Sequence, residues 1–402
     1  MTKLSPEKKL YFIPHHAVVK PDSLTTKLRV VFDASAKTSS GRSLNQCMHI
    51  GARQQSDLFE ILIRWRRHKC IQGRHREMYR QIKLDTEDQR YHTILWREQP
   101  ATPIKEYQLT TATFGTAAAP FMATRTLRQI ADDAKTEYPL AEHLIKNDFY
   151  VDDFISGSNS LENAIKEKDE VIKALQSGGM TLRKWTSNDQ AFLRTIPDEQ
   201  TEKVLQLIGT DDTKALGIRW NPRTDHFGFE VQWASDKRVT SKRELLSEAS
   251  KLYDPLGWLA PIMIKAKLIM QQTYTKEIGW DDPLPESIVE QWSQFKSELP
   301  SVTKLRIPRW IQLNNETMES ALVGFCDASE KGYSAVVYTR IKNNEAVTVT
   351  MVASKTRVAP IKSKLTIPQL ELCGAVLLSN LMIRTKKALN LAEFQHSHGR
   401  IQ

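Results

Sequence analysis

In residues 147–157 the chain reads NDFYVDDFISG, with two adjacent carboxylates between short arms of apolar and aromatic side chains. The arms, residues 149–151 and 154–155, are typical of paired strands, and the acidic pair Asp152-Asp153 then forms the turn between them. Two like charges side by side repel each other, and a divalent cation such as Mg²⁺ would neutralise them through their oxygen atoms. The alternative is an ordinary exposed hairpin tip, since acidic residues favour turns.

The composition indicates a globular protein with a polyanionic partner. A length of 402 residues predicts two or three lobes. Lys and Arg number 57 against 47 Asp and Glu, and this net charge of +10 favours nucleic acid as the partner. The four cysteines show no Cys-x-x-Cys spacing, which indicates reduced thiols in an intracellular protein. No apolar run approaches the length of a membrane span and the N-terminus is polar, so we expect neither a membrane anchor nor a secretory leader.

The first 235 residues alternate between strand and helix patterns. Residues 11–36 predict a β-hairpin whose second strand carries Lys27 and Arg29 on one face, a pair suited to gripping a phosphate. Two solvated strand cations are an equal alternative. The remaining pattern predicts a helix over 56–67 that ends in a basic run, a strand leading into a helical turn over 70–82, paired strands over 91–96 and 106–109, a segment over 113–121 that leads into a helix through 130, a helix over 161–177, a strand over 180–185, and a hairpin of 215–222 with 227–231.

The last part of the chain predicts helices over 241–252 and 260–275, a linker at 280–285, and then a separate unit. A buried strand over 322–329 carries Asp327 near its end, and strands over 333–340 and 347–353 continue it as a meander. A helix opens at Ile367 and carries Glu371. The two acids are able to converge on a metal, although a surface Asp and a helix Glu are the simpler alternative.

Together these segments resemble the polymerase region of retroelements, in particular the BEL/Pao class of long-terminal-repeat retrotransposons. The resemblance is carried by the order and spacing of RVVFDAS at 29–35, FGTAAAPF at 114–121, YVDD at 150–153, LRKW at 182–185 and LGI at 216–218. It implies an α+β fold, a right-hand polymerase of fingers, palm and thumb followed by a truncated ribonuclease H-like α/β domain. The expected divisions are 1–55 for the N-terminal fingers hairpin region, 56–235 for the palm and fingers, 236–300 for the thumb or connection, and 301–402 for the partial ribonuclease H-like domain.

The resemblance also implies roles for single residues. Asp152 and Asp153 would be catalytic metal ligands, and two Mg²⁺ ions would activate the primer 3′-hydroxyl and steady the leaving pyrophosphate. The implied partners are an RNA/DNA template–primer duplex and deoxynucleoside triphosphates. The remaining implied contacts are Lys27, Arg29, Tyr79 as the sugar gate, Phe114 and Gly115 for the nucleotide, Lys184, Leu216 and Gly217 for primer and template, and Asp327 and Glu371 as the ribonuclease H-like acids.

One position departs from the family pattern. The family places a metal-binding Asp on a central strand five residues before the sugar gate, and counting back from Tyr79 gives Arg74. A guanidinium is a permanent cation and competes with Mg²⁺ for carboxylates. We therefore expect Arg74 to form a salt bridge with Asp152 or Asp153 in place of an ion, which weakens metal binding and impairs catalysis. Glu77 would face elsewhere and is a poor substitute.

A second departure lies at the C-terminus. Ribonuclease H needs a third acid after the Glu371 helix, but residues 389–402 contain no Asp and only Glu393. We therefore expect the ribonuclease fold to be incomplete and inactive, and His396 and His398 to be exposed tail residues rather than metal ligands. A peptidase name is sometimes attached to this family, yet the chain has no Asp-Thr-Gly or Asp-Ser-Gly triplet, so no aspartic protease is expected.

Three hypotheses about the function of the chain remain open at this point. The first is a retroelement polymerase fragment with an impaired metal site, whose ancestral activity is RNA-directed DNA synthesis. The second is a non-catalytic nucleic-acid-binding remnant, or a protein retained by the host, that uses the cleft without chemistry. The third is an unexpressed relic. Salt-sensitive duplex binding without nucleotide incorporation would favour the second hypothesis.

Overall fold

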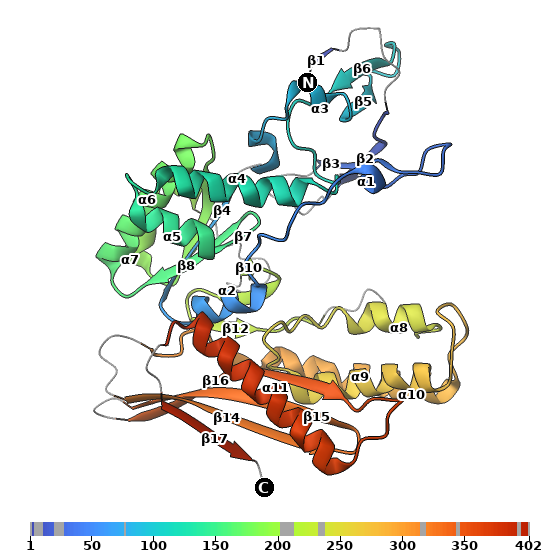
Figure 1. Cartoon of the computed structure of the whole chain (residues 1–402), viewed down its shortest axis with the longest axis vertical. Helices are drawn as coiled ribbons and strands as arrows, with labels where there is room; N and C mark the ends of the chain where they lie inside the picture. The colour runs from blue at the N-terminus through green and yellow to red at the C-terminus, as the bar shows by residue number, and fades with distance from the viewer. Residues whose placement is uncertain are drawn as a thin grey trace. The chain divides into compact units, whose positions relative to one another are not determined.

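The α+β class predicted from the sequence is confirmed by a computed structural model, which describes residues 2–3, 11–19, 28–75, 78–201, 213–231, 238–313, 319–342, 346–391 and 395–400 (Figure 1). The chain divides into two compact units. The first comprises residues 1–56, 73–154 and 165–184, and the second comprises 57–72, 155–164 and 185–402.

The N-terminal part of the first unit is built from short antiparallel strands. The predicted hairpin is present, with β2 (His15–Val19) paired to β3 (Leu28–Phe32). A core of Ile13, Ala34 and Ile94 holds this region together. The other elements are the sheet of β1 (Thr2–Lys3), β6 (Lys105–Gln108) and β5 (Thr93–Trp96), the helices α1 (Leu44–Cys47) and α3 (Thr86–Gln89), and the 3₁₀ turn η1 (Met78–Gln81).

Helices and the acidic turn make up the rest of this unit. Helix α4 (Ala119–Ala134) has Pro120 in its first turn, a position that suits proline, and packs beside α5 (Pro139–Asn147) (Figure 1). Helix α6 has the predicted bounds, Leu161–Ser177. A four-stranded sheet of order β7-β8-β4-β9 consists of β7 (Phe149–Tyr150), β8 (Asp153–Ser158), β4 (Lys69–His75) and β9 (Leu182–Ser187), and its last three strands run through both units.

In the second unit, α2 (Leu58–Trp65) packs against a small sheet. Trp65 is buried, and its ring centroid lies 5.4 Å from that of Trp220 and 5.1 Å from that of Phe227. The sheet has the order β10 (Thr213–Ala215), β11 (Ile218–Asn221), β12 (His226–Gly228) and β13 (Arg306–Pro308). The short elements α7 (Gln190–Leu193) and η2 (Asp198–Gln200) precede it.

Two fully buried arginines fasten α2 to distant strands. Arg66 donates to the carbonyl oxygens of Pro308 (2.9 Å), Arg309 (3.1 Å), Met351 (2.8 Å) and Val352 (2.7 Å). Burial, together with the charge of Arg309, lowers the pKa of Arg66 to about 9. A buried guanidinium must have its donors satisfied. These charge-assisted bonds to backbone carbonyls therefore hold the end of α2 against the distant strands.

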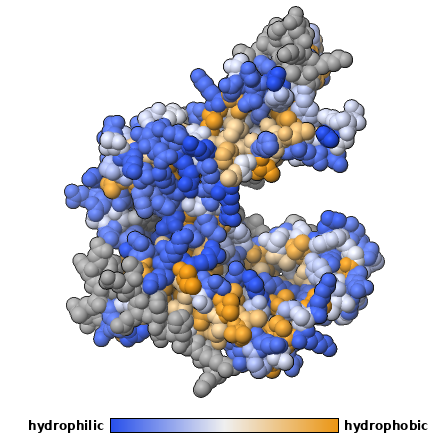
Figure 2. Space-filling model, viewed as in Figure 1, coloured by the Kyte–Doolittle hydropathy of each residue, from blue (hydrophilic) through white to orange (hydrophobic). Residues whose placement is uncertain are grey.

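The C-terminal part is a sheet covered by a long helix. Strands β14 (Glu319–Ser329), β15 (Gly332–Lys342) and β16 (Val347–Val358) form the predicted meander, and β17 (Gln395–Arg400) pairs parallel to β14. Helix α11 (Ile367–Ala388) lies across β14 and β15 (Figure 1). In Figure 2 apolar surface gathers in this part of the molecule, where Leu372, Val376 and Ile383 of α11 are exposed.

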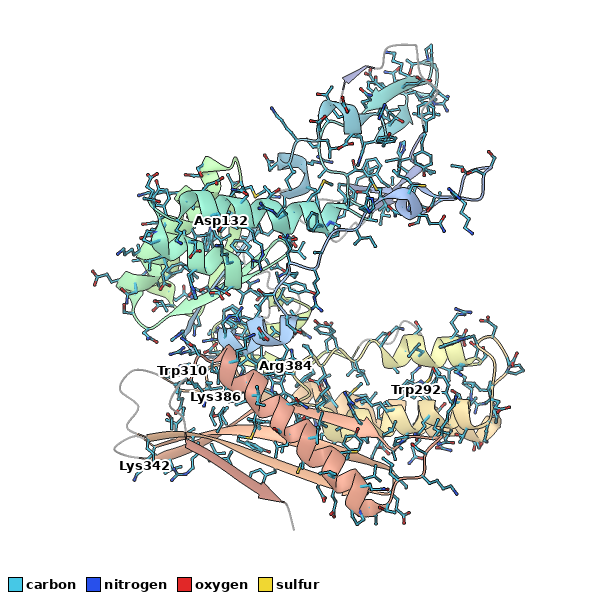
Figure 3. All side chains as sticks on the ribbon, viewed as in Figure 1. Asp132, Trp292, Trp310, Lys342, Arg384 and Lys386 are labelled. Carbon is cyan, nitrogen blue, oxygen red and sulfur yellow. The ribbon has the colours of Figure 1, made fainter. Side chains whose placement is uncertain are left out.

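The remaining helices are α8 (Lys242–Ala249), α9 (Ala260–Thr275), α10 (Glu286–Glu298) and the 3₁₀ segment η3 (Leu299–Lys304). Trp292 of α10, labelled in Figure 3, donates from its indole nitrogen to Glu248 at 2.7 Å. The Asp254-Pro255-Leu256-Gly257 segment contacts the C-terminal sheet, because the Leu256 carbonyl accepts from the Ser354 amide at 2.8 Å. In the part of the chain that the structure describes, none of the helices has the length and hydrophobicity that crossing a bilayer requires.

Candidate functional site

The acidic pair stands at a tight hairpin, as predicted, but the turn lies one residue earlier than the predicted Asp152-Asp153 turn. Phe149 pairs with Phe154 and Tyr150 with Asp153, so Val151 and Asp152 form the turn and Asp153 opens β8. Val151 has φ of 54°, a left-handed conformation that a β-branched residue rarely adopts. Asp153 is only 5% exposed, whereas Asp152 is half-buried. The turn is therefore strained and holds its carboxylates at the edge of the protein interior.

Gln55 holds the turn in this conformation. Its Nε2 atom donates to the Phe149 carbonyl at 2.8 Å, and its Oε1 atom accepts from the Val151 amide at 3.0 Å. The Phe149 and Phe154 rings pack below, with centroids 5.0 Å apart. Two hydrogen bonds from one amide side chain help to offset the strain of a left-handed valine, which costs on the order of 1–3 kcal/mol. Gln55 was not among the residues predicted from the sequence.

Tyr79 lies within electrostatic reach of the turn. Burial, together with the negative charge of Asp152, raises the pKa of the Tyr79 phenol. The residue belongs to η1, which follows the central strand β4. The structure thus brings the residue predicted as sugar gate near one of the predicted metal ligands.

The strand that carries Arg74 is the hydrogen-bonded neighbour of β8, which Asp153 opens. The backbone of Arg74 is part of β4, but its side chain lies outside the described residues, as does Glu77. The predicted salt bridge between Arg74 and the aspartates therefore also lies outside them. It stays a prediction.

The metal site that the resemblance implies calls for three carboxylates. Asp152 and Asp153 supply two, and Asp148 is a further buried acid of the same stretch. Nowhere among the described residues do three His, Cys, Asp or Glu side chains come together in a way that would hold an ion.

The N-terminal residues predicted to contact a nucleotide lie in one region of the first unit. Arg29 is exposed on β3, while Lys27 lies outside the described residues. Phe114 packs against Phe32 of the same strand, with ring centroids 5.2 Å apart. Gly115 has φ of 95°, and a Cβ there would stand 2.2 Å from the Phe32 carbonyl oxygen, so this close approach requires glycine.

Asn45 fixes the loop that follows Phe114. Its Nδ2 atom donates to the Gly115 carbonyl at 3.0 Å, and its Oδ1 atom accepts from the Ala117 amide at 2.7 Å. This is the same two-sided amide arrangement that Gln55 makes at the acidic turn. Neither residue could be identified from local sequence patterns, because each bonds to a segment at least 70 positions away.

The residues predicted to contact primer and template lie at irregular backbone positions. Lys184 belongs to β9 and has φ of 58°. Leu216 and Gly217, with φ of 49° and 83°, form the turn between β10 and β11. Lys184 belongs to the first unit, and the turn belongs to the second.

The predicted ribonuclease H-like acids lie toward the same end of the C-terminal sheet. Asp327 is exposed near the end of β14, and Glu371 lies in the first turns of α11. A Cβ at Gly374, one turn after Glu371, would lie 3.6 Å from the Asp327 carbonyl oxygen. This is an ordinary van der Waals distance, so the first turns of α11 lie against the strand where Asp327 stands. The side chains of His396 and His398 lie outside the described residues.

Comparisons with known proteins agree with this arrangement. Residues 241–398 match the family described as Pao retrotransposon-like RNaseH-like domain. The foamy viral protease-reverse transcriptase, solved with an RNA/DNA hybrid, matches with a TM-score of 0.55 and 15% identity over 97% of this chain and 44% of its own length. A dRH form of the same viral protein, solved with double-stranded DNA, matches with a TM-score of 0.58 and 14% identity over 100% of this chain and 67% of its own. No curated protein sequence matches. The fold is thus that of a retroviral reverse transcriptase with an RNaseH-like C-terminal region.

Proposed function

We propose that this chain, which carries a Pao retrotransposon-like RNaseH-like domain over residues 241–398, is the reverse transcriptase region of a retroelement polyprotein that binds a template–primer duplex but is impaired in DNA synthesis. The observation that carries the proposal is the strained acidic hairpin clamped by Gln55, in a sheet whose neighbouring strand bears an arginine. We propose that the chain divides after residues 55, 235 and 300 into the fingers hairpin region, the palm and fingers, the thumb or connection, and the partial ribonuclease H-like domain.

Duplex binding is the part that the fold and charge support. The two foamy viral structures of the same fold hold an RNA/DNA hybrid and double-stranded DNA. The net charge of +10 suits a phosphate backbone. We propose that Lys184, Leu216 and Gly217 contact primer and template, and that Arg29, Tyr79, Phe114 and Gly115, with Lys27, face an incoming deoxynucleotide.

Impairment is the part that the acidic turn supports. Asp152 and Asp153 are the residues that would hold Mg²⁺, and residue 74, where the family pattern has a further carboxylate, is an arginine. Arg74 stands in the adjacent strand, where its charge would compete with a cation. We infer that Mg²⁺ binding is weakened and that the C-terminal acids Asp327 and Glu371 do not complete a nuclease.

Duplex affinity tests the binding half of the proposal. The affinity of the full chain for a fluorescent RNA/DNA template–primer is measured by anisotropy across about 50–200 mM salt, a range in which phosphate contacts weaken steeply. We expect a strong, negative dependence on salt, and a weaker affinity for the Lys184→Ala variant. Absence of duplex binding at the lowest salt would overturn the proposal.

A second candidate function is nucleic-acid binding with no chemistry at all, which the arginine at position 74 also favours. Replacing Arg74 with Asp, the residue that the family pattern has there, distinguishes the two candidate functions. An Arg74→Asp chain that still incorporates no nucleotide would favour the purely binding role.

A further inference from the structure

The first unit has a cavity of about 410 Å³ outside the residues assigned above, lined by Arg53, Gln54, Arg125, Arg128, Asp132 and Lys146. Four of these six side chains are cations and one is a carboxylate. Asp132 is labelled on α4 in Figure 3, and Figure 2 shows a mostly hydrophilic surface, with a few apolar patches, in the region of α4 and α5. We propose that this cavity is a second phosphate-binding site.

One face of α4 supplies half of the lining. Arg125, Arg128 and Asp132 stand three and four residues apart, so their side chains leave the helix on the same side. Two like charges at this spacing destabilise an isolated helix. A face that keeps both arginines is thus suited to an anion that neutralises them.

The two arginines of α4 donate to neutral acceptors. Arg125 donates from Nη2 to Gln129 Oε1 at 2.8 Å, and Arg128 donates from Nη2 to the Gln54 carbonyl at 2.8 Å. These bonds fix the direction of each guanidinium but do not cancel its charge. Each guanidinium has further N–H groups of the kind that bind phosphate oxygens through charge-assisted hydrogen bonds.

The acids at the site are already engaged by one lysine. Lys146 Nζ lies 2.5 Å from Asp132 Oδ1 and 2.7 Å from Glu142 Oε1. Lys146, with Arg125 and Arg128, lowers the pKa of the Asp132 carboxyl, so this acid is charged at neutral pH and holds the lysine at the cavity wall. The arginines thus leave the cavity positive.

Gln54 supplies an independent observation. Its Oε1 atom is buried, and no donor in the described part of the chain bonds to it. A buried acceptor without a donor costs roughly 1–3 kcal/mol. Because this atom is shielded, the ligand class rests on the basic lining. The four cations of the cavity and the net charge of +10 suit the phosphates of a nucleotide or a nucleic acid, which we infer as the ligand class.

The cavity adjoins the peptide that clamps the acidic turn. Gln54 accepts from Arg128 with its carbonyl, and the next residue, Gln55, bonds to both sides of Val151. Ser56 donates to the Lys146 carbonyl at 3.3 Å. A phosphate held by Arg53 and Arg125 would therefore sit beside the same segment that supports the turn.

Two double variants of the full chain test the site. Arg53→Ala/Arg125→Ala removes two cations from the cavity and leaves the Arg128 bond to Gln54 intact. Lys166→Ala/Lys173→Ala removes the same charge from exposed positions of α6 and is the matched control. Thermal unfolding of both variants at the wild-type temperature shows that each is folded.

The probe is a fluorescent single-stranded oligothymidylate, measured against salt, with tripolyphosphate as competitor. We expect the cavity variant to lose about tenfold in affinity and about one unit of the slope of log K against log salt, while the control keeps the wild-type values. Competition by tripolyphosphate in wild type alone identifies a free nucleotide phosphate as the ligand, and no competition identifies the phosphodiester of a strand.

Equal losses in both variants, or no loss in either, would overturn the site. The site is separate from the proposed template–primer contacts, so the two failures are distinguishable. If wild type binds the template–primer duplex while the cavity variant matches it on oligothymidylate, only the second site is refuted.

Discussion

Gln55 and Val151 are joined by a hydrogen bond of 3.0 Å from the Val151 amide to the Gln55 side-chain oxygen, across 96 positions of sequence. The bond is made at a left-handed valine, beside the two aspartates on which the proposed chemistry depends. The geometry of the acidic turn is therefore set in part by a residue far from it in the chain. This dependence can be tested directly.

Replacing Gln55 with Met keeps the length of the side chain and removes both hydrogen bonds to the turn. We expect the free energy of unfolding to fall by about 1–3 kcal/mol, because two backbone groups lose their partner. Urea denaturation measures this change. Gln176→Met, at an exposed position of α6, is the control, and an equal loss in both variants would contradict the role of Gln55.

Gly115 and Gly41 form a matched pair that tests the close backbone approach at Gly115. Both have positive φ, 95° and 76°, but a Cβ at Gly115 meets the Phe32 carbonyl oxygen at 2.2 Å and one at Gly41 meets nothing within 4 Å. We expect Gly41→Ala to cost about 1 kcal/mol from backbone strain alone, and Gly115→Ala to cost at least about 2 kcal/mol more. Urea denaturation compares the two variants. Equal losses in the free energy of unfolding would show that the backbone at Gly115 moves to accept a Cβ, and would contradict the prediction.

Arg309 and Arg243 make similar two-bond contacts in opposite surroundings. Arg309 is fully buried and bonds to Asp225 at 2.6 and 2.9 Å, whereas exposed Arg243 bonds to Asp281 at 2.7 and 2.9 Å. Lysine cannot reproduce the guanidinium fork. We expect Arg309→Lys to lower the free energy of unfolding by about 1–3 kcal/mol, since the buried carbonyl oxygens of Trp65 and His68 lose a donor, and Arg243→Lys to leave it near the wild-type value. Similar effects at both positions would contradict the role assigned to burial.

His68 makes the stability of the chain depend on pH. Burial, followed by the charge of Arg67, lowers its pKa to about 4, even though Asn159 bonds to the ring. The unfolded chain takes up this proton near pH 6.5 and the folded chain only near pH 4, so stability is lost as the pH falls through that window. Urea denaturation between pH 7 and about 4.5 should show a smaller decline for His68→Gln than for wild type. Parallel curves would refute the assignment.

The elements with strong sequence periodicity were predictable. The acidic hairpin, the bounds of α6 and the three-stranded meander follow from local patterns, because apolar spacing and turn residues act within a few positions. Helix α10 was missed, although Ile288, Val289, Trp292 and Phe295 recur at helical spacing just after the predicted linker. Helix α5 was missed as well, since it has only 9 residues.

The supporting contacts were not predictable from the sequence. Arg66 lies in what reads as a basic run, yet it is fully buried and bonded to carbonyls more than 240 positions away. Gln55 and Asn45 are ordinary polar residues in sequence terms, and their function as clamps depends on which segments the fold brings to them. Local patterns carry no information about such partners.

We propose above that the fold retains template–primer binding while the arginine at position 74 impairs DNA synthesis. Primer extension with Mg²⁺ on an RNA template tests it most directly, comparing wild type, Arg74→Asp, and Arg74→Asp combined with Asp152→Asn. We predict that wild type binds the duplex without incorporating nucleotides, that Arg74→Asp gains Mg²⁺-dependent incorporation, and that the added Asp152→Asn abolishes it. Clear Mg²⁺-dependent synthesis by the wild-type chain would contradict the account.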